Sequence, residues 1–244
     1  MAKLTLDGLT AQLTQAFGDA LTAVVLYGSA ARGERIEGTS DHNVLVIVRT
    51  VTPASLRAAA AATAAWADSG NPPPLVITDA EWRSSRDVFA MEHADIDDRH
   101  RILAGALPRQ AGPVDTNDLR HQLEFEAMGK LIRFRQGILA CAGDPKLELE
   151  LLVGAKSAVL VLFRTLLRVH GDAVPDDVAE VVRRTAARTG FDPAPFLAVI
   201  AHAGGSEAIA KSNADAVLEA FHAGLRRFVA HVDAMVHPDH PATD

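Results

Sequence analysis

The chain has 244 residues and a formal net charge of −7 at neutral pH, which argues against a broad nucleic-acid-binding face. Its hydrophobic fraction of 48% and charged fraction of 23% are those of a globular protein with a sizeable core, not of a disordered or fibrous chain. The single cysteine, Cys141, excludes an intramolecular disulfide and fits a reducing compartment. We therefore expect a cytoplasmic protein.

The first 110 residues alternate helical and strand-like patterns, which predicts one α/β domain over 1–110. The N-terminal segment carries apolar residues at helical spacing and lacks the apolar core of a signal peptide. We expect a mixed sheet covered by helices on one side. The expected elements are strands at 22–27, 43–49, 74–78 and 88–96, a short helix after Gly28 and an Ala-rich helix at 54–68.

One stretch, from residue 21 to 48, carries the chemistry. An apolar run ends in Gly28 and Ser29, and a second apolar run follows Asp41, His42 and Asn43. Side chains two apart in a strand share a face, so positions 41 and 43 would face a common site while His42 points away. Gly28 would let the backbone approach a phosphate closely, and the helix after Ser29 would offer free N–H groups.

This pattern resembles the nucleotidyltransferase superfamily, which includes DNA polymerase β, the aminoglycoside nucleotidyltransferases and the minimal nucleotidyltransferases. The family motif places Gly-Ser after one strand and Asp-x-Asp or Asp-x-Glu at the start of the next. Here Asn43 stands where the second carboxylate is expected. The resemblance extends to the segment 119–139 and implies an α+β fold, a nucleotidyltransferase-like mixed sheet with helices followed by an all-α helical bundle.

The resemblance also implies a reaction, the transfer of a nucleoside monophosphate from ATP or another NTP to a hydroxyl of a small molecule or protein. Mg²⁺ would hold the triphosphate, with Asp41 as a ligand and catalytic residue. The family's third carboxylate is expected on the strand at 88–96, where Asp95 fits best as metal ligand or base. Glu92 is the alternative and would face the opposite side of a regular strand. Since Mg²⁺ prefers anionic oxygen ligands, the neutral amide of Asn43 would weaken this metal site.

Binding of the nucleotide would involve Gly28, Ser29 and Arg32 in the first domain. By the same resemblance, Lys130 in a later helix is a candidate to face the triphosphate. Arg133 would share its face and Arg135 would be rotated away. The alternative for these three cations is a solvated helix face.

From residue 115 onward the patterns are helical and predict a bundle of four or five antiparallel helices over 115–236, followed by a flexible tail, 237–244. Apolar residues in the last helix, 213–236, recur at three- and four-residue spacing. The most apolar stretch, 147–167, contains Lys156 and Arg164, so we expect no membrane span.

Two alternatives to an active enzyme follow from the same residues. The missing carboxylate at Asn43 is compatible with a degenerate member, a pseudoenzyme that binds a nucleotide or a protein partner without turnover. Arg164 and His170 fit the loose Arg-x4-6-His pattern of HEPN ribonucleases, helical proteins that often accompany minimal nucleotidyltransferases, which suggests a toxin–antitoxin component. The acceptor, the preferred base and the oligomeric state stay open.

Overall fold

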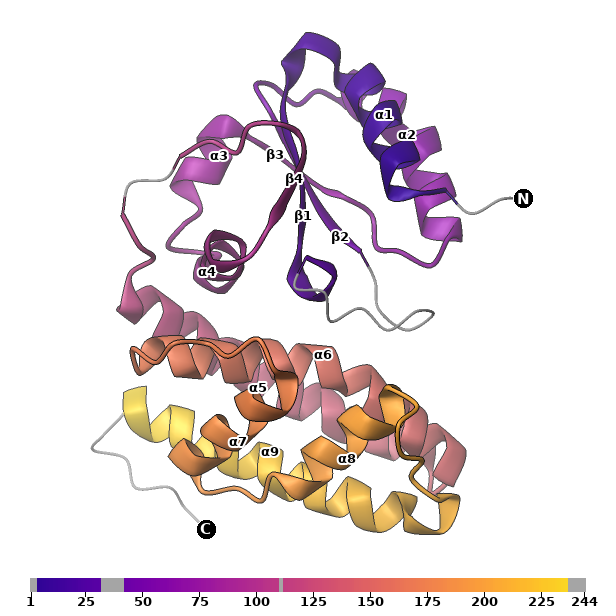
Figure 1. The fold of residues 1–244 in the computed structure, drawn as a ribbon, viewed down its shortest axis with the longest axis vertical. Coiled ribbons are helices and arrows are strands. Elements are labelled where there is room, and N and C mark those ends of the chain that lie inside the picture. Colours follow the sequence, from indigo (N-terminus) through magenta and orange to yellow (C-terminus); the bar gives the residue numbers. More distant parts are fainter. Residues whose placement is uncertain (1–3, 32–41, 110–111, 237–244) are drawn as a thin grey trace. The chain divides into compact units, whose positions relative to one another are not determined.

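The computed structural model describes residues 4–31, 42–109 and 112–236. The chain divides into two compact units, Met1–Val114 and Asp115–Asp244 (Figure 1). Arg32 and Asp41, both expected in the functional site, lie outside the described residues, and so does the expected tail, 237–244.

The first unit is built on a four-stranded sheet in the order β3-β2-β1-β4. Its strands are β1 (Leu21–Tyr27), β2 (Asn43–Val48), β3 (Leu75–Thr78) and β4 (Arg101–Gly105). β1 pairs antiparallel with both β2 and β4, and β2 pairs parallel with β3. The sheet is therefore mixed, as the sequence predicted.

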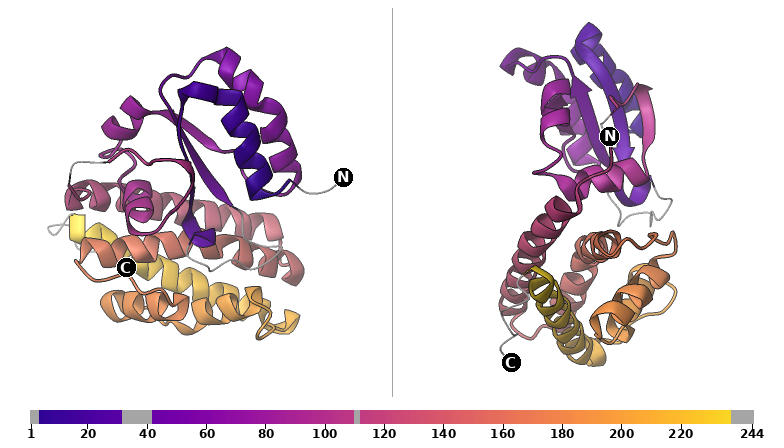
Figure 2. Two further views of the ribbon diagram at one scale, coloured as in Figure 1. Left: turned by 45° about the horizontal axis from the view of Figure 1, so that its top comes forward. Right: turned by 90° about the vertical axis from the view of Figure 1, so that its left-hand side faces the viewer.

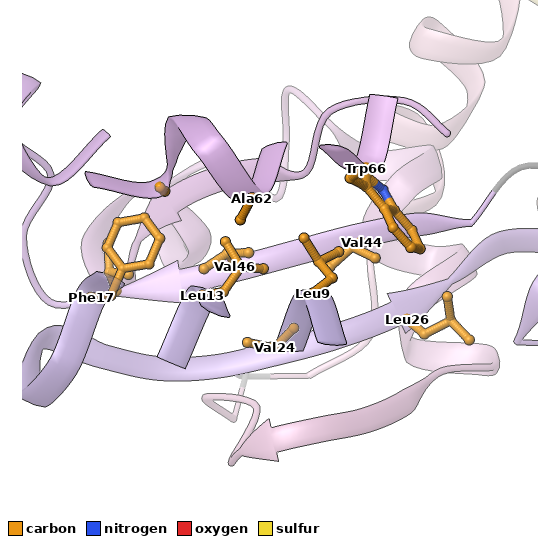
Figure 3. Packing of buried hydrophobic residues seen from close by; sticks show 11 residues of the cluster. Leu9, Leu13, Phe17, Val24, Leu26, Val44, Val46, Ala62 and Trp66 are labelled. Atoms are coloured by element: carbon orange, nitrogen blue, oxygen red, sulfur yellow. The ribbon is translucent and has the colours of Figure 1, made fainter. Parts of the chain in front are cut away.

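Two helices, α1 (Leu6–Phe17) and α2 (Pro53–Asp68), cover one face of this sheet (Figure 3). α1 begins where the Thr5 hydroxyl accepts a hydrogen bond from the Gly8 N–H, and α2 begins with a capping box between Thr52 and Ser55. Their buried side chains pack on the even-numbered residues of β1 and β2. The main members of this core are Leu9, Leu13, Phe17, Val24, Leu26, Val44, Val46 and Trp66.

The opposite face is covered by α3 (Asp79–Ser84) and α4 (Ala90–Asp98) (Figure 1). Trp82 of α3 and Ile96 of α4 pack on the odd-numbered strand residues, such as Val25 and Leu45. The expectation that helices cover one side only is therefore wrong. Both faces of β1 and β2 are apolar, so each face needs a helical cover.

The expected strand at 88–96 is also wrong, because residues 90–98 form α4 and the last strand, β4, comes later, at Arg101–Gly105. Residues 93–96 of α4 are buried in succession. A helix buried on several sides shows neither the period of a half-buried strand nor that of an amphipathic helix.

The second unit is a bundle of helices (Figure 2). Its α-helices are α5 (Thr116–Cys141), α6 (Pro145–Val169), α7 (Val178–Thr189), α8 (Ala194–Ala203) and α9 (Ala214–Val236). Aspartates cap the N-termini of α5, α6 and α7, at Asp115, Asp144 and Asp177.

Phenylalanine rings fill the centre of the bundle, with Phe163 at ring-centroid distances of 5.2 Å from Phe191 and 5.0 Å from Phe228. The described residues also include the short 3₁₀ helices η1 (Gly18–Ala20), η2 (Gly28–Ala30) and η3 (Lys211–Asn213). None of the described helices combines the length and the apolar character that a membrane crossing would need.

Candidate functional site

The end of β1 and the start of β2 lie side by side. Tyr27 stands directly opposite Asn43 in the antiparallel pair, and Tyr27 packs against the core on the α3–α4 side of the sheet. Strand alternation places Asn43 on that side too, two residues before Leu45. The His42 side chain lies on the opposite side, where its ring centroid is 5.6 Å from that of Trp66. The backbone N–H of His42 donates to Asn71 Oδ1 at 3.1 Å.

Gly28 follows β1 with a φ of 73°, a region that L side chains rarely adopt. A Cβ at this position would lie 2.9 Å from Asn43 Nδ2. The absence of a side chain at Gly28 therefore leaves room for the Asn43 amide. Ser29 sits half-buried in the 3₁₀ turn η2, which the Ala31 N–H closes by donating to the Gly28 carbonyl at 3.1 Å.

The two candidate carboxylates, Glu92 and Asp95, lie on α4. Because they are three residues apart in a helix, they share a face, whereas a strand would have separated them. Asp95 is buried, with 7% of its surface exposed, and Glu92 is exposed. Burial raises the pKa of the Tyr27 hydroxyl above its ordinary value, and the charges of Glu92 and Asp95 raise that pKa further. Both carboxylates are therefore close to the end of β1.

Tyr27 is the residue of this site that the sequence reasoning missed. Two signals in the sequence point to it. Tyr27 directly precedes Gly28, and strand alternation places its side chain on the same face of the sheet as Asn43. As the single tyrosine of the chain, it is also a natural probe of the charges around it.

A hard divalent cation fits the chemistry of these side chains, because carboxylate and amide oxygens are its preferred ligands. Among the described residues, however, no group of three or more Asp, Glu, His or Cys side chains gathers closely enough to hold a metal ion. Asn43, Glu92 and Asp95 would need a further carboxylate, and Asp41 is the residue that the sequence offers for this role.

The cations proposed to face the triphosphate belong to the helical unit. Lys130 Nζ lies 3.2 Å from Glu126 Oε2, and Lys130 and Arg133 line a cavity of about 270 Å³ among α5, α6 and α9. Arg135 is directed elsewhere, since its Nε donates to His222 Nε2 at 3.3 Å.

The residues of the ribonuclease pattern lie on α6. Arg164 is only 3% exposed, and His170 caps the C-terminus of the helix with its ring 5.8 Å from that of His231. An RNA-cleaving pair must reach a phosphate from the surface, and the burial of Arg164 does not suit this task.

Comparison with solved structures finds a spectinomycin adenyltransferase from Enterococcus faecialis, determined with ATP and spectinomycin. The similarity has a TM-score of 0.59 at 12% sequence identity and covers 90% of this chain and 96% of that chain. The chain has a nucleotidyltransferase-type fold. No protein-family model matches it, and no curated protein matches its sequence.

Proposed function

We propose that this chain is a nucleotidyltransferase with a weakened metal site, which transfers a nucleoside monophosphate from ATP or another NTP to a hydroxyl of a small molecule or protein. The observation that supports it best is the meeting of Asn43 and Gly28 at one end of the sheet, beside the carboxylates of α4. The structural similarity to an adenyltransferase supports the same reaction class.

In this proposal Gly28 and Ser29 hold the triphosphate, with Arg32 as a further cation. Asp41, Asn43 and one carboxylate of α4 hold Mg²⁺, which supplies charge neutralisation for the triphosphate and the leaving group. Asp95 accepts the proton of the acceptor hydroxyl, whose oxygen bonds to the α-phosphorus. The bond from that phosphorus to the bridging oxygen breaks, and pyrophosphate leaves.

The two remaining roles are those of base and of metal ligand. We assign them to Asp95 and Glu92 according to the exposure of each side chain. Asp95, the buried carboxylate of the pair, is assigned the role of base. Glu92, exposed on the same face of α4, can reach a cation without first being desolvated. The neutral amide of Asn43 leaves the cation with less anionic charge than an Asp-x-Asp pair would supply.

A second candidate function is nucleotide binding without turnover. Asn43 is the observation that favours it, because the motif of the resembled superfamily has a carboxylate there to hold the metal ions. The two functions differ in one measurable property, which is the dependence of nucleotide binding on a divalent cation.

Calorimetric titration with a non-hydrolysable ATP analogue, with and without Mg²⁺, tests the proposal. We expect Mg²⁺ to tighten binding at least several-fold, and Glu92→Gln to remove most of that gain. Asp19→Asn, a change to a carboxylate at the opposite end of β1, is the matched control and should keep it. Binding that ignores Mg²⁺ would favour the non-catalytic function, and no binding in either condition would overturn both.

A further inference from the structure

Helix α5 has two apolar faces. Its inner face is buried in the bundle through Leu123, Ala127 and Leu131. The opposite face carries a second series at alternating four- and three-residue spacing, here called the outer stripe: His121, Phe125, Met128, Ile132, Arg135 and Leu139. The apolar members of this series are unusually exposed: Phe125 76%, Met128 44%, Ile132 47% and Leu139 81%. Apolar residues gathered in this way mark a contact surface.

A hollow runs beside the outer stripe, between α5 and α9. It encloses about 440 Å³ and has Gly129, Val229 and Val232 among its lining residues, together with Phe125 and Ile132 from the stripe. A Cβ added at Gly129 would meet nothing within 4 Å, so another backbone can approach α5 closely at this position. The surface thus presents protruding side chains and a recess next to each other, as a self-complementary contact requires.

We propose that two copies of this chain pair through the outer stripes of α5, antiparallel and related by a two-fold axis at the level of Lys130. The four-three spacing is that of helices that pack side by side over several turns. Positions equidistant from residue 130 then oppose each other. Met128 meets Ile132 of the second copy, Phe125 meets Arg135, and His121 meets Leu139.

The distribution of charge selects the antiparallel direction. The first half of the contact carries Glu124 and Glu126, and the second half carries Arg133 and Arg135. Antiparallel pairing places each acidic half against a basic half, whereas parallel pairing would place like charges together. It also brings the guanidinium of Arg135 onto the ring of Phe125 in the second copy, a favourable cation–π arrangement.

The outer stripe spans 19 residues, from position 121 to position 139, or about 27 Å of helix. A contact of one helix pair lies at the small end of specific interfaces. We therefore expect reversible association in the micromolar range rather than an obligate dimer.

Sedimentation equilibrium of the full chain over a range of concentrations tests the association. Wild type should shift from monomer to dimer, and Phe125→Glu and Ile132→Glu should each weaken the dimer at least tenfold. Leu147→Glu, at an exposed apolar residue of α6 that is 41% exposed, is the matched control. A wild type that stays monomeric at several hundred micromolar, as it would if the stripe packs elsewhere on its own chain, overturns the proposal. Equal effects of Phe125→Glu and Leu147→Glu also overturn it.

Disulfide cross-linking in a Cys141→Ser background tests the antiparallel register. With an added thiol oxidant, the double variant Met128→Cys/Ile132→Cys should form a covalent dimer readily. Met128→Cys alone should not, because residue 128 of one chain faces residue 132 of the other chain and not residue 128. Efficient cross-linking of the single variant would show parallel pairing and overturn the proposed axis. Circular dichroism of each variant confirms that the exposed substitutions leave the fold intact.

Discussion

Gly28 and Asn43 share one small space at the end of β1. The positive φ of Gly28 and the 2.9 Å separation between its hypothetical Cβ and Asn43 Nδ2 are two separate reasons for a glycine here. The first is a property of the turn, and the second depends on which side chain stands across the strand pair.

Substitution of Gly28 separates these two causes. Gly28→Ala should lower the free energy of unfolding by roughly 1–3 kcal/mol, because alanine is strained at this φ and its methyl group displaces the Asn43 amide. In an Asn43→Ala background the second cost disappears, so the same change should be milder. Urea unfolding of the four proteins of this double-mutant cycle measures the coupling. Strictly additive effects would show that the two residues do not compete for space.

The sequence anticipated Gly28 as a position of close approach and predicted that residues 42 and 43 face opposite sides of the strand. It did not predict that the Asn43 amide fills the space beside Gly28, because register across two strands is a tertiary property. A bulky substitution such as Gly28→Val therefore disturbs Asn43 as well as any phosphate. We expect it to destabilise the fold, so a loss of nucleotide binding in that variant would be ambiguous.

His93 is a second buried titratable residue of α4, beside Asp95. It is 1% exposed, its ring lies 4.0 Å from that of Trp82, and its Nε2 is 3.1 Å from Ser85 Oγ. The pKa of His93 is lowered from 6.5 to about 4, mainly by burial and in smaller part by the nearby Arg86, while Asp97 acts in the opposite direction. The folded state therefore keeps this imidazole neutral where the unfolded chain would protonate it.

A pH dependence of stability follows from this difference. Above pH 6.5 the burial of neutral His93 imposes no proton-linked penalty, and as the pH falls from 6.5 toward 4 the unfolded state binds the extra proton. The resulting decrease in the free energy of unfolding should reach roughly 2–3 kcal/mol. Urea unfolding at several pH values should show this slope in wild type and a flatter one in His93→Gln. Parallel profiles for the two proteins would contradict a neutral, buried His93.

At the scale of elements, α4 shows where the sequence patterns fail. The alternation of Asp95, Ile96 and Asp97 is typical of a strand, yet Ile96 is the residue that fixes a helix onto the sheet. The true strand, β4, is a sheet edge with exposed Arg101 and Ile102, and its pattern is correspondingly weak. Strands β1, β2 and β3 and helices α1 and α2 lie where the sequence predicted them, because their apolar periods and caps are local, whereas the short helix α3 was not predicted.

The helical form of α4 has a consequence for Tyr27. Because Glu92 and Asp95 share a face, their charges act on the Tyr27 hydroxyl together. Asp95→Asn and Glu92→Gln should each lower the pKa of Tyr27 toward its ordinary value, and Asp19→Asn should leave it unchanged. Spectrophotometric titration is unambiguous, since the chain has one tyrosine. A Tyr27 pKa that responds to neither α4 substitution would place these carboxylates away from the site.

At the scale of the whole molecule, the sequence alone predicted that a unit with a mixed sheet is followed by a helical unit. Helix caps and stops, such as Asp144 and Gly190, are local signals, and the Gly-Ser turn before Asn43 pointed to the fold that the structural similarity shows. Two features were out of reach. The cover on the second face of the sheet depends on Trp82 and Ile96, which are far in sequence from the residues of β1 and β2 that they cover. The outer stripe of α5 can be recognised only once the inner face is known.

The most direct measurement of the proposed metal site is a thermal-shift titration of wild type and Asn43→Asp with Mg²⁺ and Mn²⁺. A carboxylate at position 43 gives the cation an anionic ligand where the amide offers only a dipole. Without metal, it adds a like charge near Glu92 and Asp95 and should lower the melting temperature slightly. We predict a larger metal-induced rise for Asn43→Asp than for wild type. An equal rise in both proteins would contradict a metal site at Asn43.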